Sequence, residues 1–463
     1  MSLETTDRLV SHIVDARLDD LTAHDIEKAK IFLLDTLGVG IAGSSGAAVA
    51  ELLKTVQGWG AGDEATVWVT GERVSAQAAA MVNAYQIHCL EYDCVHEGAV
   101  VHPMATVLST MMAYAERRTS QGRPVNGSDF LLAMVLGVDV AAFLGMAATG
   151  PVRFFRPATA GGLGATAAIA RLEGLSAEIT KDALGNMYGQ TCGTLQPHVE
   201  GSPLLGLQIG FNARGALSAL DLARAGFKGP HDIIDGQYGY LPMIEAGQFD
   251  IDGAWRDLGR VWQMSELSHK PFPSGRLTHG VVDALRYITQ RSGISPDDIE
   301  TITGYVPPLV YRLVGRPDVP NPEPNYAKLC LSYVAGAWMA RGQVDVPEFR
   351  GEDVLSDPEI HRHAAKVRLV LDENPDENAL DPQRFEFKLA DGRLESVELP
   401  HVFGHPKAAL SVEENRAKFD RCVTYGAREI PTDQAGRLVE AVDHVETMPD
   451  VSVLSRLTAV EDK

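Results

Sequence analysis

The first half of this chain is a succession of alanine- and glycine-rich segments in which apolar residues recur at helical spacing. Runs of small residues, such as 78–80 and 165–170, let neighbouring helix backbones approach closely. Thr22 and Asp25 have the spacing of a capping box before the first segment. The pattern predicts a tight helical bundle, with helices at 26–39, 47–58, 75–90, 103–118, 129–148, 159–174, 176–190 and 209–226.

Two features of these helices have a competing interpretation. Residues 161–164, Gly-Gly-Leu-Gly, faintly resemble a phosphate-binding loop, but no strand precedes them and no Lys-Ser/Thr pair follows, so helix-packing glycines are the better interpretation. The apolar run 130–148 is interrupted by Gly137 and Asp139, which favours a core helix over a membrane span.

The pattern changes after about residue 266, where shorter elements alternate. We expect helices at 274–291, 326–341 and 358–365, and strands at 299–306, 367–371, 384–389 and 394–399, the last two joined by a two-residue Asp391-Gly392 hairpin. Helical spacing returns at 411–425 and 432–446. The predicted fold is therefore mainly α, with a large all-helical domain built from both chain ends, 1–265 and 403–463, and an inserted smaller α+β domain at 266–402.

The composition restricts the partners of the chain. A formal net charge of −21 and a pI of about 5.1 argue against nucleic acid and against an anionic membrane surface. Five scattered cysteines without a CxxC pair indicate a reduced, cytoplasmic protein with no zinc site of the usual spacing. The N-terminus begins with polar and acidic residues, so we expect no signal peptide.

The segment 88–103 is the strongest functional candidate. It places Glu91, Asp93, His96 and His102 among small and apolar residues, between two helices that are predicted to be buried. Burying such groups without partners costs several kcal/mol, so each is either satisfied by a partner or used in chemistry. The alternative to a functional role is a helix end whose polar groups cap each other. Taken alone, His102 is equally well explained as a buried histidine with a hydrogen-bond partner. The density of the cluster favours function.

The order of these residues, His-x-Leu-acid-aromatic-Asp followed by His96 and then His102-Pro103, resembles the motif of the MmgE/PrpD family. Further motifs in the same order extend the resemblance along nearly the whole chain: Asp35-Thr36-Leu37-Gly38, 158–164 with Gly174-Leu175-Ser176, Glu200-Gly201-Ser202, Ala225-Gly226-Phe227 with Gly229-Pro230, Lys270-Pro271-Phe272-Pro273, and Tyr333-Val334.

The resemblance implies a cofactor-free and metal-free enzyme with an all-helical domain and an α+β lid, commonly a homodimer. Activities of the family include 2-methylcitrate dehydratase, cis-aconitate decarboxylase and iminodisuccinate epimerase. Their common thread is a small polycarboxylate and the movement of a proton at a carbon next to a carboxylate. We therefore expect a dehydratase-like lyase first, an epimerase second and a decarboxylase third. A catalytically inactive anion-binding homologue and a scaffold without a site are the alternatives that are not enzymes.

Matched position by position, the family's catalytic residues fall on Glu91, Asp93, His102, Lys270 and Tyr333. His102 suits general acid–base work because imidazole titrates near neutral pH. Lys270 suits a substrate carboxylate or a developing enediolate, and a solvated surface lysine is the alternative. Tyr333 is the least distinctive of the five, since a plain core tyrosine fits its apolar helix equally well.

A second set of residues is expected to bind the substrate. It consists of His96, Arg156, Gln208, Arg276 and His279. Arg276 and His279, one helical turn apart, form either an anion clamp or an exposed helix pair. A metal site from Glu91, Asp93, His96 and His102 is a weak alternative, because the histidine spacing is not a standard one.

The chain also departs from the family pattern. Glu91, Cys94 and Val95 stand where the family often has Asp, Asp and Thr, and Arg156 stands where a histidine is usual. Leu205 and Gln208 replace a lysine and a histidine. Since an arginine binds carboxylates but is a poor acid or base, these changes predict a substrate with fewer carboxylates or a different head group.

Overall fold

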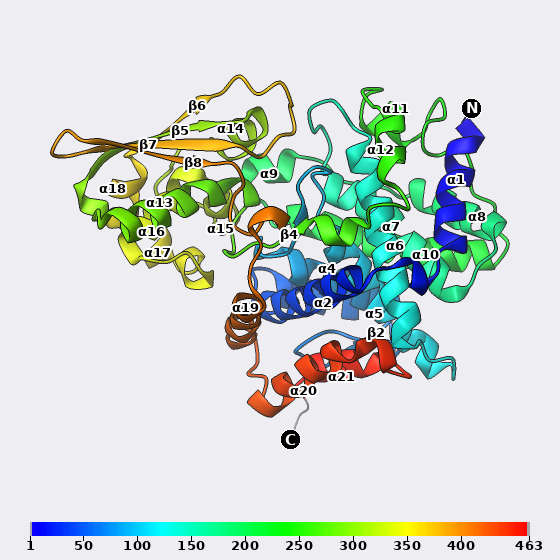
Figure 1. Ribbon diagram of the computed structural model, residues 1–463. Helices are drawn as coiled ribbons and strands as arrows, with labels where there is room; N and C mark the ends of the chain where they lie inside the picture. Colours follow the sequence, from blue (N-terminus) through cyan, green and yellow to red (C-terminus); the bar gives the residue numbers. More distant parts are fainter. Residues whose placement is uncertain (1, 461–463) are drawn as a thin grey trace.

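The computed structural model describes residues 2–460 and is mainly helical (Figure 1). The helices of the first part of the chain are α1 Ser2–Asp15, α2 Ala23–Gly43, α3 Val49–Gln57, α4 Ala76–His88, α5 Pro103–Ser120, α6 Gly127–Met146, α7 Arg156–Glu173, α8 Ala177–Tyr188, α9 Gln196–Glu200, α10 Leu204–Arg224, α11 Tyr240–Ile244 and α12 Ile251–Asp257. The last helices, orange to red in Figure 1, contact α2 and α5: α19 Val412–Thr424, α20 Thr432–Asp443 and α21 Ser452–Thr458.

Local sequence signals explain several of these helices. The capping box is confirmed, since the Asp25 amide donates to the Thr22 hydroxyl and the Thr22 amide donates to the Asp25 carboxylate. A Cβ on Gly164 would lie 2.4 Å from the Gly137 carbonyl oxygen, so α7 and α6 touch backbone to backbone. This confirms that the glycines of 161–164 serve helix packing.

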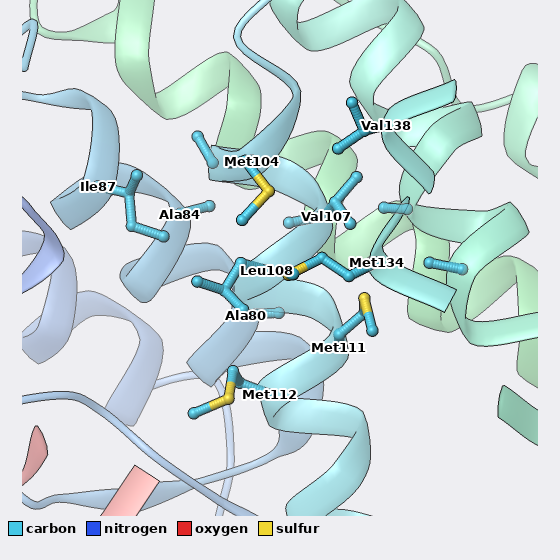
Figure 2. Packing of buried hydrophobic residues seen from close by; sticks show 14 of the residues in the cluster. Ala80, Ala84, Ile87, Met104, Val107, Leu108, Met111, Met112, Met134 and Val138 are labelled. Atoms are coloured by element: carbon cyan, nitrogen blue, oxygen red, sulfur yellow. The ribbon is translucent and has the colours of Figure 1, made fainter. Parts of the chain in front are cut away.

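The centre of the bundle is filled by side chains of α4, α5 and α6 (Figure 2). Ala80 and Ala84 of α4 face the longer Leu108 and Met112 of α5, so small residues on one helix accommodate large ones on the next. Among the described residues, α6 alone is long and apolar enough to cross a membrane, and 89% of its apolar window is buried inside the protein.

The second part of the chain is built on a four-stranded sheet. Its strands are β5 Ile299–Val306, β6 Val367–Leu371, β7 Gln383–Leu389 and β8 Leu394–Leu399, in the order β6-β5-β7-β8. β5 and β6 are parallel, and the other pairs are antiparallel. The helices of this part are α13 His279–Ser292, α14 Pro308–Val314, α15 Pro324–Lys328, α16 Leu331–Arg341, α17 Glu352–Leu355 and α18 Pro358–Ala364.

One face of this sheet is buried. Alternate residues of β7, including Phe385 and Phe387, point into an apolar cluster shared with α13 and α16. A larger apolar cluster fills the helical bundle and includes residues from both ends of the chain. The domain boundaries at 265/266 and 402/403, and the action of the α+β part as a lid, stay predictions.

The structure differs from the expected elements at a few ends. Helix α1 was not predicted, and the helix expected from 274 begins at His279, after a 3-10 turn, Arg276–Thr278. The helix expected at 326–341 is divided into α15 and α16. The hairpin has a three-residue loop, 390–392, because Leu389 still pairs with Arg393, and Gly392 supplies the left-handed residue with φ 88°.

Candidate active site

A small strand pairing joins the two parts of the chain at the segment 88–103. β3, Val95–His96, pairs antiparallel with β4, Leu267–Ser268, while the short strands β1, Ala65–Thr66, and β2, Arg73–Val74, pair with each other elsewhere. The β3–β4 pairing places Lys270, which lies just beyond β4, against the acids that precede β3. Residues far apart in sequence therefore meet at one point because of two short strands.

Four charged groups form a buried cluster at this junction. The Lys270 Nζ lies 2.9 Å from Glu91 Oε2 and 3.9 Å from Asp93 Oδ1. His88, the last residue of α4, lies between the two acids, with Nε2 3.2 Å from Glu91 and Nδ1 3.0 Å from Asp93. Two carboxylates thus face two cations, which is the arrangement that makes burial of charge tolerable. Glu91 also has a left-handed backbone, with φ 53°.

The cluster fixes the protonation states of its members. Burial opposes charge on His88, but the carboxylates of Asp93 and Glu91 outweigh it and raise the pKa of His88 to about 9. Burial likewise opposes ionisation of the two acids. The charges of Lys270 and His88 nevertheless hold the pKa of Glu91 well below its usual range, and the charge of His88 does the same for the pKa of Asp93. At neutral pH the acids are therefore ionised and His88 is an imidazolium.

His102, at the start of α5, is in a different state. Burial and the nearby charge of Lys270 lower its pKa, against the opposing effect of Asp93, so the ring is neutral at neutral pH. Its Nδ1 lies 3.0 Å from the Cys94 carbonyl oxygen, which can only accept a hydrogen bond, and 3.4 Å from Asp93. The proton is therefore assigned to Nδ1, and Nε2 is left with a free lone pair. This is the form of a general base.

Beside this cluster is a cavity of about 90 Å³, called the first cavity below. Most of its wall is aliphatic or aromatic and includes Leu205, where the family usually has a lysine. Its charged or titratable lining residues are Glu91, Glu97, His102, His198 and Arg276. Asp93 and Lys270 are fully buried behind this wall. Reacting groups therefore meet a small, largely apolar space with few polar contacts.

His198 of α9 is a residue that sequence reasoning missed. Its Nδ1 lies 2.9 Å from Nη2 of Arg316, and because a guanidinium can only donate, Nδ1 accepts and the proton of the neutral ring is on Nε2. Burial and the charge of Arg316 lower the pKa of His198 to about 4. His198 therefore offers the first cavity an N–H donor where His102 offers a lone pair. A lone histidine in a short helix gave no sequence signal for this role.

Arg276 reaches the first cavity but is already well bonded. Its Nε donates to Glu97 at 2.8 Å, and its Nη atoms donate to the carbonyls of Phe403 at 2.6 Å and Val402 at 2.9 Å. His279 is buried beside it, with Nδ1 3.5 Å from the Arg276 guanidinium. The exposed-pair interpretation of Arg276 and His279 is therefore wrong, and so is the surface interpretation of Lys270.

Two of the other predicted binding residues are engaged inside the protein. Arg156 does clamp a carboxylate in the expected two-pronged way, but the carboxylate is that of buried Glu245, with both N–O distances 2.9 Å. Its third donor goes to the Ala99 carbonyl. Gln208 exchanges hydrogen bonds with the backbone of Thr194. The structure does not bring either side chain to the first cavity.

His96 and Tyr333 are placed similarly. His96 donates to the Gln263 side chain at 2.8 Å and accepts from the Ala99 amide, which fixes the loop rather than a ligand. Tyr333 lies in the apolar cluster of the α+β part and donates to the Glu348 carbonyl. Neither lines the first cavity. In this structure Tyr333 has the surroundings of a core tyrosine, and contact of His96 and Tyr333 with substrate stays a prediction.

His88, Asp93 and His102 also have the spacing of a metal-ligand group, with one ligand atom of each within 4.8 Å of the others. The weak alternative drawn from the sequence used His96, His102, Glu91 and Asp93, so this set keeps His102 and Asp93 and has His88 in place of His96 and Glu91. The Nδ1 atoms of both histidines are already hydrogen-bonded, to Asp93 and to the Cys94 carbonyl. One ring nitrogen of each histidine and the Asp93 carboxylate are thus already bonded within the protein.

Comparison with known proteins agrees with the motif order. The MmgE/PrpD N-terminal domain matches residues 7–252, and the MmgE/PrpD C-terminal domain matches residues 272–444. The chain is 28% identical to a cis-aconitate decarboxylase of Mus musculus, over 99% of this chain and 94% of that protein. It is 27% identical to a cis-aconitate decarboxylase of Homo sapiens, over 98% and 94%. A cis-aconitate decarboxylase-like protein of Aspergillus oryzae is 26% identical, over 98% and 97%.

Proposed function

The chain belongs to the MmgE/PrpD family and has the lyase-type character of that family, and from this premise we propose that it is a cofactor-independent lyase for a small carboxylate. The observation that carries the proposal is the neutral His102, whose Nδ1 proton is held by the Cys94 carbonyl and whose Nε2 is free beside the first cavity. His102 removes a proton from the carbon next to the substrate carboxylate.

The rest of the first cavity supports this step. Removal of the proton creates negative charge on the substrate carboxylate, and His198 Nε2–H is placed to donate to the developing enediolate. A hydroxyl group on the neighbouring carbon then leaves as hydroxide and takes up the proton held by His102. Water and an alkene are the products, and His102 returns to its starting form. This is dehydration, the outcome first expected from the sequence.

The charge of the cavity supports a substrate with few carboxylates. Glu91 and Glu97 line it. Lys270 is already paired with Glu91 and Arg276 with Glu97, so neither cation is free to bind a substrate carboxylate. Each further carboxylate on a substrate would enter a small apolar space that already contains two acids. We therefore propose a mono- or dicarboxylate rather than a tricarboxylate.

Decarboxylation is the second candidate, because the named relatives are cis-aconitate decarboxylases over almost the whole chain. The aliphatic wall adds to this support, since an apolar space removes the hydration shell that stabilises a carboxylate before it leaves as CO₂. Epimerisation shares the first proton transfer and differs only in the face that is reprotonated. A homodimer in the cytoplasm stays part of the proposal, as does the inactive anion-binding homologue as its alternative.

One assay separates these reactions. The enzyme is incubated in deuterated water with a panel of citrate-like, aspartate-like and hydroxy-diacid compounds, and proton NMR follows each. We expect a new alkene signal from a hydroxy acid, with exchange of the proton next to its carboxylate. Loss of CO₂ without prior exchange would establish the decarboxylase instead. Tight binding without exchange or product for every compound would overturn the lyase and favour the inactive homologue.

A further inference from the structure

A second cavity, of about 240 Å³, adjoins the turn that carries the active-site acids. Leu90 lines this second cavity, and the next residue, Glu91, lines the first. The other walls come from residues 45–47, between α2 and α3, and from segments of the α+β part at 324–328 and 346–351. Its charged lining residues are two cations, Lys328 and Arg350, and none of the described residues around it is acidic.

Neither cation has a carboxylate partner in the described part of the chain. Lys328 is buried, and its Nζ donates to the Cys89 carbonyl at 2.9 Å and the Asn325 side-chain oxygen at 3.2 Å, both uncharged. Arg350 donates to the Ser45 hydroxyl at 2.5 Å. In contrast, the cations around the first cavity, Lys270 and Arg276, each contact a glutamate. Two cations in one cavity without an ion pair among the described residues are unusual in a protein with a net charge of −21, and the charge of Glu91 acts on Lys328 only from beyond ion-pair distance.

The start of α3 adds to the positive potential. This nine-residue helix begins at Val49, directly after the lining residues 45–47. Its N-cap, Ala48, has no side chain that can accept a hydrogen bond from the first turn. The positive end of the helix dipole therefore follows directly in the chain on residues that line the cavity with the two cations, although Glu51 in the first turn offsets part of it.

We propose that the second cavity is a binding site for a small oxyanion, a phosphate or a carboxylate group, held between Lys328 and Arg350. Such a group supplies the missing negative charge and can accept from the ammonium and the guanidinium together, while the Ser45 hydroxyl, which donates to the Ala42 and Tyr425 carbonyls, positions Arg350. It is a site separate from the first cavity, whose cations are already paired.

The site is positioned to act on the active-site turn. Lys328 Nζ holds the Cys89 carbonyl, two residues before Glu91 with its left-handed backbone. An oxyanion that draws Lys328 toward Arg350 changes the hydrogen bond that supports this turn, and with it the position of Glu91 against Lys270. Occupancy is therefore expected to change turnover in the first cavity without competing for it.

The test measures binding of inorganic phosphate and of succinate by isothermal titration calorimetry and by the shift in melting temperature. Chloride at matched ionic strength is the control anion. The full chain is compared with Arg350→Gln and Lys328→Gln, with Lys54→Gln of α3 as a matched control that removes one exposed charge. Comparing inorganic phosphate with succinate shows whether the site prefers a phosphate group or a carboxylate group. A His102→Gln variant tests whether the anion instead occupies the first cavity.

We expect saturable binding of at least one oxyanion in the wild type, in Lys54→Gln and in His102→Gln, and binding at least about tenfold weaker in Arg350→Gln. If Lys328→Gln does not fold, Arg350→Gln decides the question, because Arg350 is only partly buried. The proposal is overturned if neither oxyanion binds better than chloride, if Arg350→Gln binds like the wild type, or if His102→Gln abolishes binding.

Discussion

His102 and His198 both line the first cavity, but different partners fix the proton on each ring. On one wall, the Cys94 carbonyl holds the Nδ1 proton of His102 and leaves a lone pair on Nε2. On the other, Arg316 donates to Nδ1 of His198 and leaves the proton on Nε2. His198 is buried and His102 is partly buried, and both rings have lowered pKa values. In these two rings, burial together with a nearby cation, Lys270 or Arg316, keeps the histidine neutral, and the hydrogen bond at Nδ1 decides whether the ring is a base or a donor.

The largest effect is expected where the base is removed. His102→Gln should lower kcat/KM about 10²–10⁴-fold, because the amide cannot accept the substrate proton, while the folded state is retained. Steady-state kinetics and the melting temperature check this. His96→Gln is the matched control from the same loop, and it should affect stability more than kcat since His96 bonds only within the protein. Wild-type turnover by His102→Gln would rule out the proposed role.

A smaller loss is expected for Asp93→Asn. Asp93 lies 3.4 Å from His102 and helps to raise the pKa of His88, but the Cys94 carbonyl still holds the proton on His102 Nδ1. We expect kcat to fall roughly 10- to 100-fold, within the range for loss of a group that orients a catalytic residue, and the pKa of His88 to fall. Kinetics and NMR titration of His88 measure the two effects. A loss as large as that of His102→Gln would mean that Asp93, not Cys94, fixes the tautomer.

The role of His198 is tested by Arg316→Met. Without the guanidinium, the pKa of His198 should rise from about 4 toward its ordinary value, and Nδ1 loses the donor that fixes the proton on Nε2. We expect a several-fold lower kcat/KM at neutral pH, where the proton of the neutral ring is no longer fixed on Nε2, and a smaller loss at acid pH, where the imidazolium donates from both nitrogens. Arg312→Met, on α14 and paired with Glu377 at the surface, is the control. An unchanged profile would remove His198 from the account of the reaction.

The smallest effect concerns stability at alkaline pH. Because the folded-state pKa of His88 is raised to about 9, above an unfolded value of about 6.5, its contribution is fully present below pH 6.5 and is lost as pH rises through 9. The melting temperature of the wild type should therefore fall between pH 7 and pH 10 by more than that of His88→Gln. Parallel curves for the two proteins would show that His88 is not the group that titrates.

Much of this arrangement was predictable from local patterns. Helical spacing located most long helices to within a few residues, and the order of the motifs identified the segment 88–103 and Lys270 as parts of one site. Local rules failed where the chain has short elements, such as the β3–β4 pairing, which buries Lys270 against Glu91 from 179 residues away.

The main obstacle to predicting the site from the sequence was that the sequence does not show which group each polar side chain contacts. Arg156 has the chemistry of a carboxylate clamp, but only the fold shows that Glu245 occupies it. The same holds for His198, whose role depends on Arg316, 118 residues further along the chain. Side-chain chemistry is a property of the sequence, whereas the choice between an internal partner and a substrate is made by tertiary contacts.

The protonation state of the two histidines is measured most directly by long-range ¹H–¹⁵N correlation NMR of the side chains, with His102→Gln and His198→Gln used for assignment. At neutral pH the structure predicts a neutral His102 with its proton on Nδ1 and a neutral His198 with its proton on Nε2. An imidazolium at His102, or a proton on its Nε2, would contradict the assignment of His102 as the base.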